Sequence, residues 1–182
     1  MFIRLASELQ KDSIVDGEGI RAVIWTQGCP HNCPGCHNPE THDYNGGFLK
    51  DIEELKDEIN SLDDETGVTF SGGDPFVQPE ACLELAKYCH SVKLNVWCYT
   101  GYTYEQLLKK AQSEPVVMNF LKEIDVLVDG RFVMKLKSYE VKFRGSKNQR
   151  IIDVKKSLEK QEIVLLDFDN LKKSSKKQEI YI

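Results

Sequence analysis

Long apolar runs are missing from this sequence, and no stretch reaches the roughly 18 apolar residues that a membrane-spanning helix needs. The opening residues 1–8 also lack the basic-then-apolar layout of a secretion signal, so we expect a cytoplasmic protein with reduced thiols. An excess of basic residues is missing too, since 24 Lys and Arg stand against 29 Asp and Glu for a net charge of −5. We therefore expect neither a membrane nor a nucleic acid as a partner.

Cysteine is too sparse for a fold held by disulfides, with 6 in 182 residues. Internal repeats and long low-complexity segments are absent from the sequence as well. A chain of this length is large enough to bury its own core, so the simplest organisation is one domain over residues 1–182. Residues from about 156 to 182 carry no motif, and we expect them to form an extension without an assigned role.

Strand-like and helix-like segments alternate along the chain, which is typical of an α/β fold with a mostly parallel sheet. The expected strands lie at about 20–27, 68–70, 94–99 and 124–128, and the expected helices at about 48–62, 79–92 and 103–122. Pro115 marks a point where the last helix could break. Beyond residue 128 the pattern weakens to two apolar runs near 151–154 and 162–168.

Three cysteines follow the first expected strand directly, with the spacing Cys29-x3-Cys33-x2-Cys36. This places three soft sulfur ligands on one loop at the carboxyl end of a strand. A structural zinc site needs four ligands, and a [4Fe–4S] cluster takes one protein ligand per iron. Three sulfurs on one loop, with no fourth nearby, indicate a cluster with one iron open to a small molecule.

Two other interpretations of this motif stay open. A zinc site is one, because His31, His37 or His42 could complete it and Cys and His are the usual ligands of zinc. A thiol redox site at Cys33 and Cys36 is the other, although such sites work with two cysteines.

The remaining cysteines fall on apolar faces. Cys82 and Cys89 are seven residues apart on an expected helix, and Cys98 shares one face of an expected strand with Val96. Buried cysteine commonly behaves as a small hydrophobe. We therefore expect these three in the core, which favours the open cluster.

The segment Ser71-Gly72-Gly73-Asp74-Pro75 follows the second expected strand. Paired glycines let the backbone approach a ligand closely, and a carboxylate can accept from an ammonium group. Gly-Gly-Asp-Pro is also ordinary turn chemistry, so the motif is weak by itself. Ligand sites in parallel sheets gather at the carboxyl ends of the strands, which would bring this loop beside the cysteines.

Together these motifs resemble those of the radical S-adenosylmethionine enzymes and, more narrowly, of the activating proteins of anaerobic (class III) ribonucleotide reductases. The resemblance runs in order from about residue 12 to 155. The segments that carry it are 16–21, 27–41, 71–75, 99–103, 125–132 and 144–150.

The resemblance implies an open, partial (β/α) barrel in which Cys29, Cys33 and Cys36 hold a [4Fe–4S] cluster. The open iron would bind S-adenosyl-L-methionine, and a 5′-deoxyadenosyl radical formed from it would take a hydrogen from a glycine of the reductase large subunit. A second implied partner is an electron donor such as flavodoxin or ferredoxin. The implied contacts to the cofactor are the backbone of Gly35, Cys36 and His37, with Gly72, Gly73 and Asp74 at the methionine amino group.

Three positions depart from the pattern of the wider superfamily. Gly35 stands where most members have an aromatic residue, Asp74 where most have Glu, and Glu18 where Pro is usual. The first two fit the narrower group. Two alternatives stay open, namely an activating enzyme for another glycyl-radical enzyme such as pyruvate formate-lyase, and a non-catalytic zinc-binding module.

Overall fold

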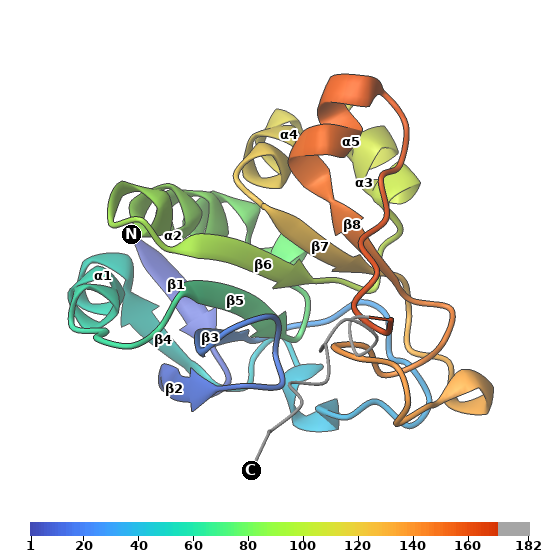
Figure 1. Ribbon diagram of the computed structural model, residues 1–182. Coiled ribbons are helices and arrows are strands. Elements are labelled where there is room, and N and C mark those ends of the chain that lie inside the picture. Colours follow the sequence, from blue (N-terminus) through green and yellow to red (C-terminus); the bar gives the residue numbers. More distant parts are fainter. Residues whose placement is uncertain (171–182) are drawn as a thin grey trace, which may run out of the picture.

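The computed structural model describes residues 1–170, which form one eight-stranded sheet with helices packed on it (Figure 1). The strand order is β4-β1-β3-β5-β6-β7-β8, and β2 pairs with β3 beside this path. The strands are β1 (Phe2–Leu5), β2 (Gln10–Ser13), β3 (Arg21–Thr26), β4 (Phe48–Asp51), β5 (Gly67–Gly72), β6 (Asn95–Tyr99), β7 (Val126–Asp129) and β8 (Arg150–Asp153). The helices are α1 (Ile52–Asn60), α2 (Pro79–Ser91), α3 (Tyr104–Lys110), α4 (Pro115–Lys122) and α5 (Val154–Lys160), with short turns η1 (Pro39–Thr41), η2 (Pro75–Val77) and η3 (Met134–Leu136).

The centre of the sheet is parallel and positions the site. Strands β3, β5, β6 and β7 pair in parallel, and antiparallel strands flank them on both sides. The carboxyl ends of the parallel strands therefore meet at one edge, where the loops after β3 and β7 gather (Figure 1). The expected α/β class is confirmed.

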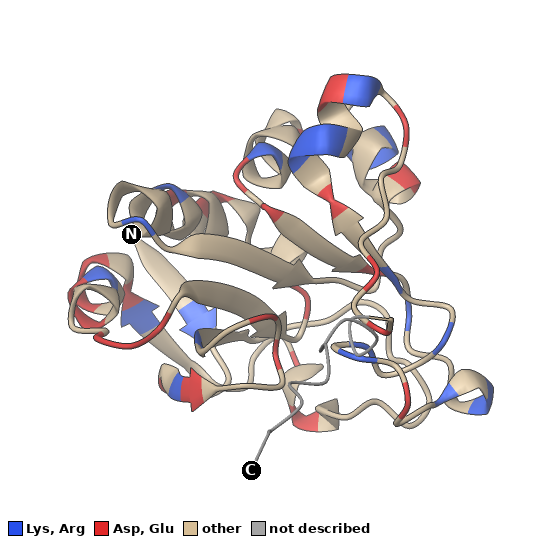
Figure 2. Cartoon of the chain, in the orientation of Figure 1, with Lys and Arg blue, Asp and Glu red and all other residues tan. Residues whose placement is uncertain are grey.

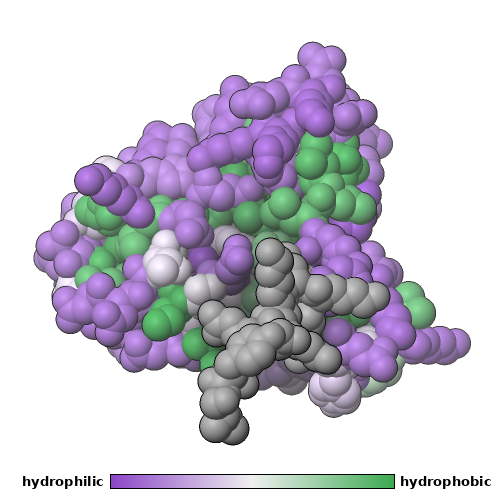
Figure 3. Space-filling model, in the orientation of Figure 1, coloured by the Kyte–Doolittle hydropathy of each residue, from purple (hydrophilic) through white to green (hydrophobic). Residues whose placement is uncertain are grey.

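Two apolar layers hold the sheet. One lies under the helices and includes the buried faces of α1, α2 and α4, while their outward surfaces are largely hydrophilic (Figure 3). The other lies on the opposite face, where Trp97 of β6 packs edge-on against Phe143 and tilted against Phe168. Phe168 belongs to the expected C-terminal extension, so part of that extension is built into the fold. Residues 171–182 lie outside the described residues.

A buried cation fixes the loop that precedes β3. The Arg21 side chain donates to Thr69 Oγ1 at 2.6 Å and to the Glu18 carbonyl at 3.1 Å, and it stacks on Trp97 at 5.3 Å. Burial lowers the pKa of Arg21 to about 10, still well above neutral pH, so the side chain stays charged. Arg21 thereby helps to hold the segment around Asp16 against the sheet, near the edge where the carboxyl ends of the parallel strands meet.

The expected helix at 48–62 is wrong over its first four residues, which form β4. This strand pairs antiparallel with β1, for example Phe2 with Asp51, and the helix starts only at Ile52. The Asp51 carboxylate caps that helix by accepting from the Glu53 amide at 3.1 Å. Backbone pairing with β1 overrides the helical spacing of the apolar residues. The break at Pro115 is confirmed, because α3 and α4 are separate helices.

The cysteines expected in the core are there. Cys82, Cys89 and Cys98 are all 0% exposed. Burial raises the pKa of each of these thiols, that of Cys89 to about 12, so they are protonated and unsuited to bind metal.

Candidate functional site

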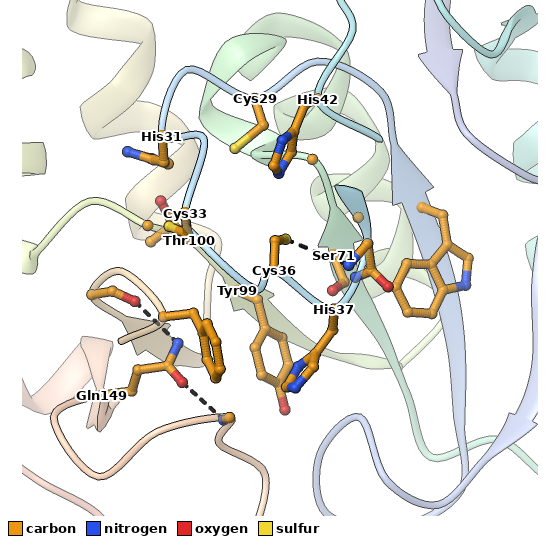
Figure 4. Close-up of a pocket in the computed structure, with 18 of the residues that line it drawn as sticks. Cys29, His31, Cys33, Cys36, His37, His42, Ser71, Tyr99, Thr100 and Gln149 are labelled. Carbon is orange, nitrogen blue, oxygen red and sulfur yellow. Dashed lines mark hydrogen bonds between the residues drawn. The ribbon is translucent and has the colours of Figure 1, made fainter. Parts of the chain in front are cut away.

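The three cysteines of the motif line a single cavity of about 260 Å³ at the carboxyl edge of the parallel strands (Figure 4). Each is partly exposed, in contrast to the three core cysteines. Gly72 at the end of β5 and Gly73 in the loop after it line the same cavity. The structure therefore brings the two loops together, as their positions after neighbouring strands indicated.

Backbone bonds close the cysteine loop on itself. The Gly28 amide donates to the Thr41 carbonyl at 2.8 Å, and the Cys29 amide to the His42 carbonyl at 3.2 Å. Gly28 has a φ of 96°, a conformation that glycine adopts without strain. The chain thus turns sharply out of β3 and returns beside its start, with the cysteines on the enclosed side.

Backbone amides surround the three sulfur atoms. The amide of Asn38 lies 3.4 Å from Cys36 Sγ. Partial burial raises the pKa of Cys29 and Cys33, and amide donors lower it in turn, from His31 for Cys29 and from Phe132 for Cys33. Hydrogen bonds to sulfur are a main means by which a protein tunes the potential of an iron–sulfur cluster. The donor set therefore fits a thiolate-bound cluster.

A single metal ion fits this arrangement poorly. Within residues 1–170, no three side chains of His, Cys, Asp or Glu converge on one point as a mononuclear site requires. His37 and His42 line the cavity without joining the cysteines in such a group. Three cysteines around one cavity, each free to bind a different iron, match a cluster instead.

The glycines at and directly after the end of β5 are required by close contact with the end of β3 and the start of the cysteine loop. The Gly73 amide donates to the Thr26 carbonyl at 2.7 Å, and a Cβ at Gly73 would lie 2.3 Å from the Gly28 carbonyl oxygen. Gly72 has a φ of 98°, and a Cβ there would lie 2.5 Å from the Thr26 carbonyl oxygen. A side chain at either position would push the two loops apart.

Asp74 follows Gly73 directly, and its carboxylate is 0% exposed. His31 Nε2 lies 2.7 Å from Asp74 Oδ2, which also accepts from Thr100 Oγ1 at 2.9 Å and from the Gly101 amide at 3.0 Å. Asp74 Oδ1 accepts from the Phe76 amide at 3.0 Å. This carboxylate therefore connects the cysteine loop, through His31, with the ends of β5 and β6.

Gly35 explains the missing aromatic residue before Cys36. Its φ is 73°, a conformation that residues with a side chain rarely adopt, and a Cβ there would also require the flexible Met134 side chain to move, because its methyl group would lie 1.9 Å away. Aromatic side chains reach the cavity from elsewhere, namely Tyr99 at the end of β6 and Phe132, whose ring packs on His37 at 4.8 Å. Phe132 lies in the 125–132 segment of the resemblance, but nothing in the sequence assigned it a role at the site.

The polar side chains of residues 144–150 form hydrogen bonds and ion pairs with other parts of this chain. Gln149 Oε1 accepts from the Gly145 amide at 2.8 Å, and Gln149 Nε2 donates to the Gly130 carbonyl at 3.0 Å (Figure 4). Arg150 forms ion pairs with Asp129 and Glu105, and its hydrogen bond to Glu105 lowers the pKa of that carboxyl group to about 2. These bonds hold the loops after β7 and before β8 against the cavity.

The three cysteines share one cavity at the edge of a mixed α/β sheet, and residues 15–152 match the family described as "4Fe-4S single cluster domain". Site and family together define a protein that carries one iron–sulfur cluster. No helix within residues 1–170 is long and apolar enough to cross a membrane.

Curated relatives narrow this class. The chain is 37% identical over 147 residues to the anaerobic ribonucleoside-triphosphate reductase-activating protein of Escherichia coli K12, covering 75% of this chain and 90% of the relative. Identity to the proteins of the same name is 33% in Haemophilus influenzae, over 76% of this chain and 90% of the relative. Identity to the Salmonella typhi protein of the same name is 34%, over 75% of this chain and 90% of the relative. The chain belongs to the family of anaerobic ribonucleoside-triphosphate reductase-activating proteins, and the resemblance drawn from its motifs is confirmed.

Proposed function

We propose that this protein is the activating enzyme of an anaerobic ribonucleotide reductase. It is an oxidoreductase that uses a [4Fe–4S] cluster and S-adenosyl-L-methionine to place a glycyl radical on the reductase large subunit. The observation that carries this function is the cavity with three cysteine ligands, one fewer than a cluster has irons, in a chain of this family.

The residues of the cavity divide into ligands and cofactor contacts. Cys29, Cys33 and Cys36 would each hold one iron. When bound and reduced by one electron, the cluster would supply, together with S-adenosyl-L-methionine, the radical chemistry that removes a hydrogen atom from a glycine Cα. The chain itself binds and orients both groups and limits the access of water to them.

The contacts to S-adenosyl-L-methionine would come from both loops. The backbone of Gly35, Cys36 and His37 forms one side, and the backbone of Gly72 and Gly73 forms the other. Cys36, His37, Gly72 and Gly73 all line the cavity, which supports this assignment. The resemblance also assigns Asp74 to the methionine amino group. Because its carboxylate is buried and occupied by four protein donors, we assign it a positioning role beneath that contact.

The sheet is open, with β4 at one end of its path and β8 at the other. This arrangement supports an open, partial barrel of the radical S-adenosylmethionine type, with one domain formed by residues 1–182. An open barrel leaves a lateral entrance for a backbone segment of a protein substrate. Reduction of the cluster requires an electron donor such as flavodoxin or ferredoxin, and we place the reaction in the cytoplasm.

Anaerobic reconstitution with iron and sulfide tests this function. We expect a brown protein with about four irons per chain. When reduced with dithionite, it should cleave S-adenosyl-L-methionine to methionine and 5′-deoxyadenosine. A colourless protein that holds one zinc ion and leaves S-adenosyl-L-methionine intact would instead identify a zinc-binding module.

A further inference from the structure

A second hollow of about 610 Å³ opens beside the cysteine cavity. The two share four lining residues, namely Asp16, His37, Tyr99 and Gly145. The walls of this groove come from the loop between β2 and β3 and from residues 138–145. The groove therefore connects the molecular surface with the cavity that the cysteines line.

Large apolar side chains stand exposed on these walls. Ile14 is 71% exposed, Val15 is 69% exposed and Tyr139 is 90% exposed. Exposed apolar side chains that gather around a groove mark an interaction site, whereas scattered ones carry no such meaning. Within residues 1–170, these three side chains keep far larger exposed fractions than the side chains of the core.

The wall that carries Tyr139 is firmly held despite its exposure. Phe143 packs on Trp97 at 5.5 Å and on Phe168 at 5.3 Å. Arg144 forms an ion pair with Asp169, and the Lys142 amide donates to the same carboxylate at 2.9 Å. The groove is thus a built surface rather than a loose loop, and a partner would not have to order it.

Positive charge gathers on one side of the groove in a chain whose net charge is −5, with Lys142 and Arg144 in that wall and Asp16 in the opposite one. Figure 2 shows basic residues on η3 and the loops beside it. The segment 131–147 contains one acidic residue, Glu140, and six basic ones, Arg131, Lys135, Lys137, Lys142, Arg144 and Lys147. Charge complementarity favours an acidic partner at this surface.

We propose that this groove docks an extended, glycine-containing segment of the reductase large subunit whose flanks carry apolar and acidic side chains. The proposal rests on the proposed function, because hydrogen abstraction requires the glycine Cα to come within about 3–3.5 Å of the reacting carbon. A segment lying in the groove would cover Ile14, Val15 and Tyr139 and lead toward the cysteines past His37 and Tyr99.

The test uses the cluster-loaded full chain with the reductase large subunit. Three groove variants are compared: the double I14D/V15D and the single Y139D change side chains that line the groove, and the double K135E/K137E changes the basic segment beside it. Leu49→Asp is the matched control, because Leu49 is 57% exposed on β4 and lies outside the groove. Affinity is measured by titration calorimetry, the glycyl radical by paramagnetic resonance, and cleavage of S-adenosyl-L-methionine without the reductase by its products.

We expect the three groove variants to bind the reductase at least about tenfold more weakly and to form the glycyl radical correspondingly slowly. Their cleavage of S-adenosyl-L-methionine should equal that of Leu49→Asp, which also reports that they are folded and loaded. Groove variants that bind and activate the reductase as Leu49→Asp does would overturn the proposal. The calorimetric arm needs no catalysis, so a protein that binds through the groove but cannot cleave S-adenosyl-L-methionine would refute the proposed function alone.

Discussion

Replacing Cys29, Cys33 or Cys36 singly by alanine is expected to abolish cleavage of S-adenosyl-L-methionine. Each substitution removes the protein ligand of one iron, and no other cysteine can replace it, because Cys82, Cys89 and Cys98 are buried in the core. Iron content after anaerobic reconstitution should fall well below about four per chain, and the brown absorption should weaken with it. The measurements are iron and sulfide analysis, the visible spectrum and product formation.

Cys98→Ala is the control for this series. It removes a buried sulfur atom, so we expect it to lower the free energy of unfolding by about 1–2 kcal/mol while the cluster and the activity stay intact. A folded Cys98→Ala protein that keeps its cluster but is inactive would contradict the core assignment. A Cys29→Ala protein that keeps a full cluster would contradict the ligand assignment.

Replacing Asp74 by alanine is expected to destabilise the protein strongly and to release the cysteine loop. The substitution leaves the Phe76 and Gly101 amides, the Thr100 hydroxyl and the His31 ring without their acceptor in a buried place. Losses of this kind in a buried charged network cost about 3–5 kcal/mol. Urea unfolding of the cluster-free protein measures the change in stability, and the rate of iron loss to a chelator measures how firmly the loop holds the cluster.

His31 separates a positioning role of Asp74 from direct contact with the cofactor. His31→Ala removes the connection to the cysteine loop and leaves the other three donors to Asp74 in place. We expect it to speed iron loss, and His31→Gln to restore retention in part, because the amide can still donate to Asp74. If Asp74→Ala instead raised the KM for S-adenosyl-L-methionine at unchanged stability and iron retention, Asp74 would belong to the cofactor contacts.

The sequence predicted the parts of this site that depend on local order. The cysteine spacing follows a strand, the glycine pair follows the next one, and parallel strands end at the same edge of a sheet. Two observations along one chain thus predicted one cavity. The core cysteines were predictable for the same reason, since their spacing places them on apolar faces.

The parts that escaped prediction depend on contacts between distant segments. Strands β1 and β2 are four residues each, Phe-Ile-Arg-Leu and Gln-Lys-Asp-Ser, and neither sequence alternates apolar with polar residues, although Ile3 and Leu5 of β1 are buried. Without β1, the apolar residues at the start of β4 matched a helix. The packing of Met134 over Gly35 and the burial of Asp74 under His31 join positions about 100 and 43 residues apart, and no spacing in the sequence reveals them.

The most direct test of the account is paramagnetic resonance of the mixed system. Reduced, cluster-loaded protein is incubated anaerobically with S-adenosyl-L-methionine and the large subunit of an anaerobic ribonucleotide reductase, and the spectrum is recorded before and after exposure to air. We predict a glycyl-radical doublet that requires both S-adenosyl-L-methionine and the reductase and that disappears in air. Absence of the doublet from the reductase, with one appearing instead on pyruvate formate-lyase under the same conditions, would contradict the assignment.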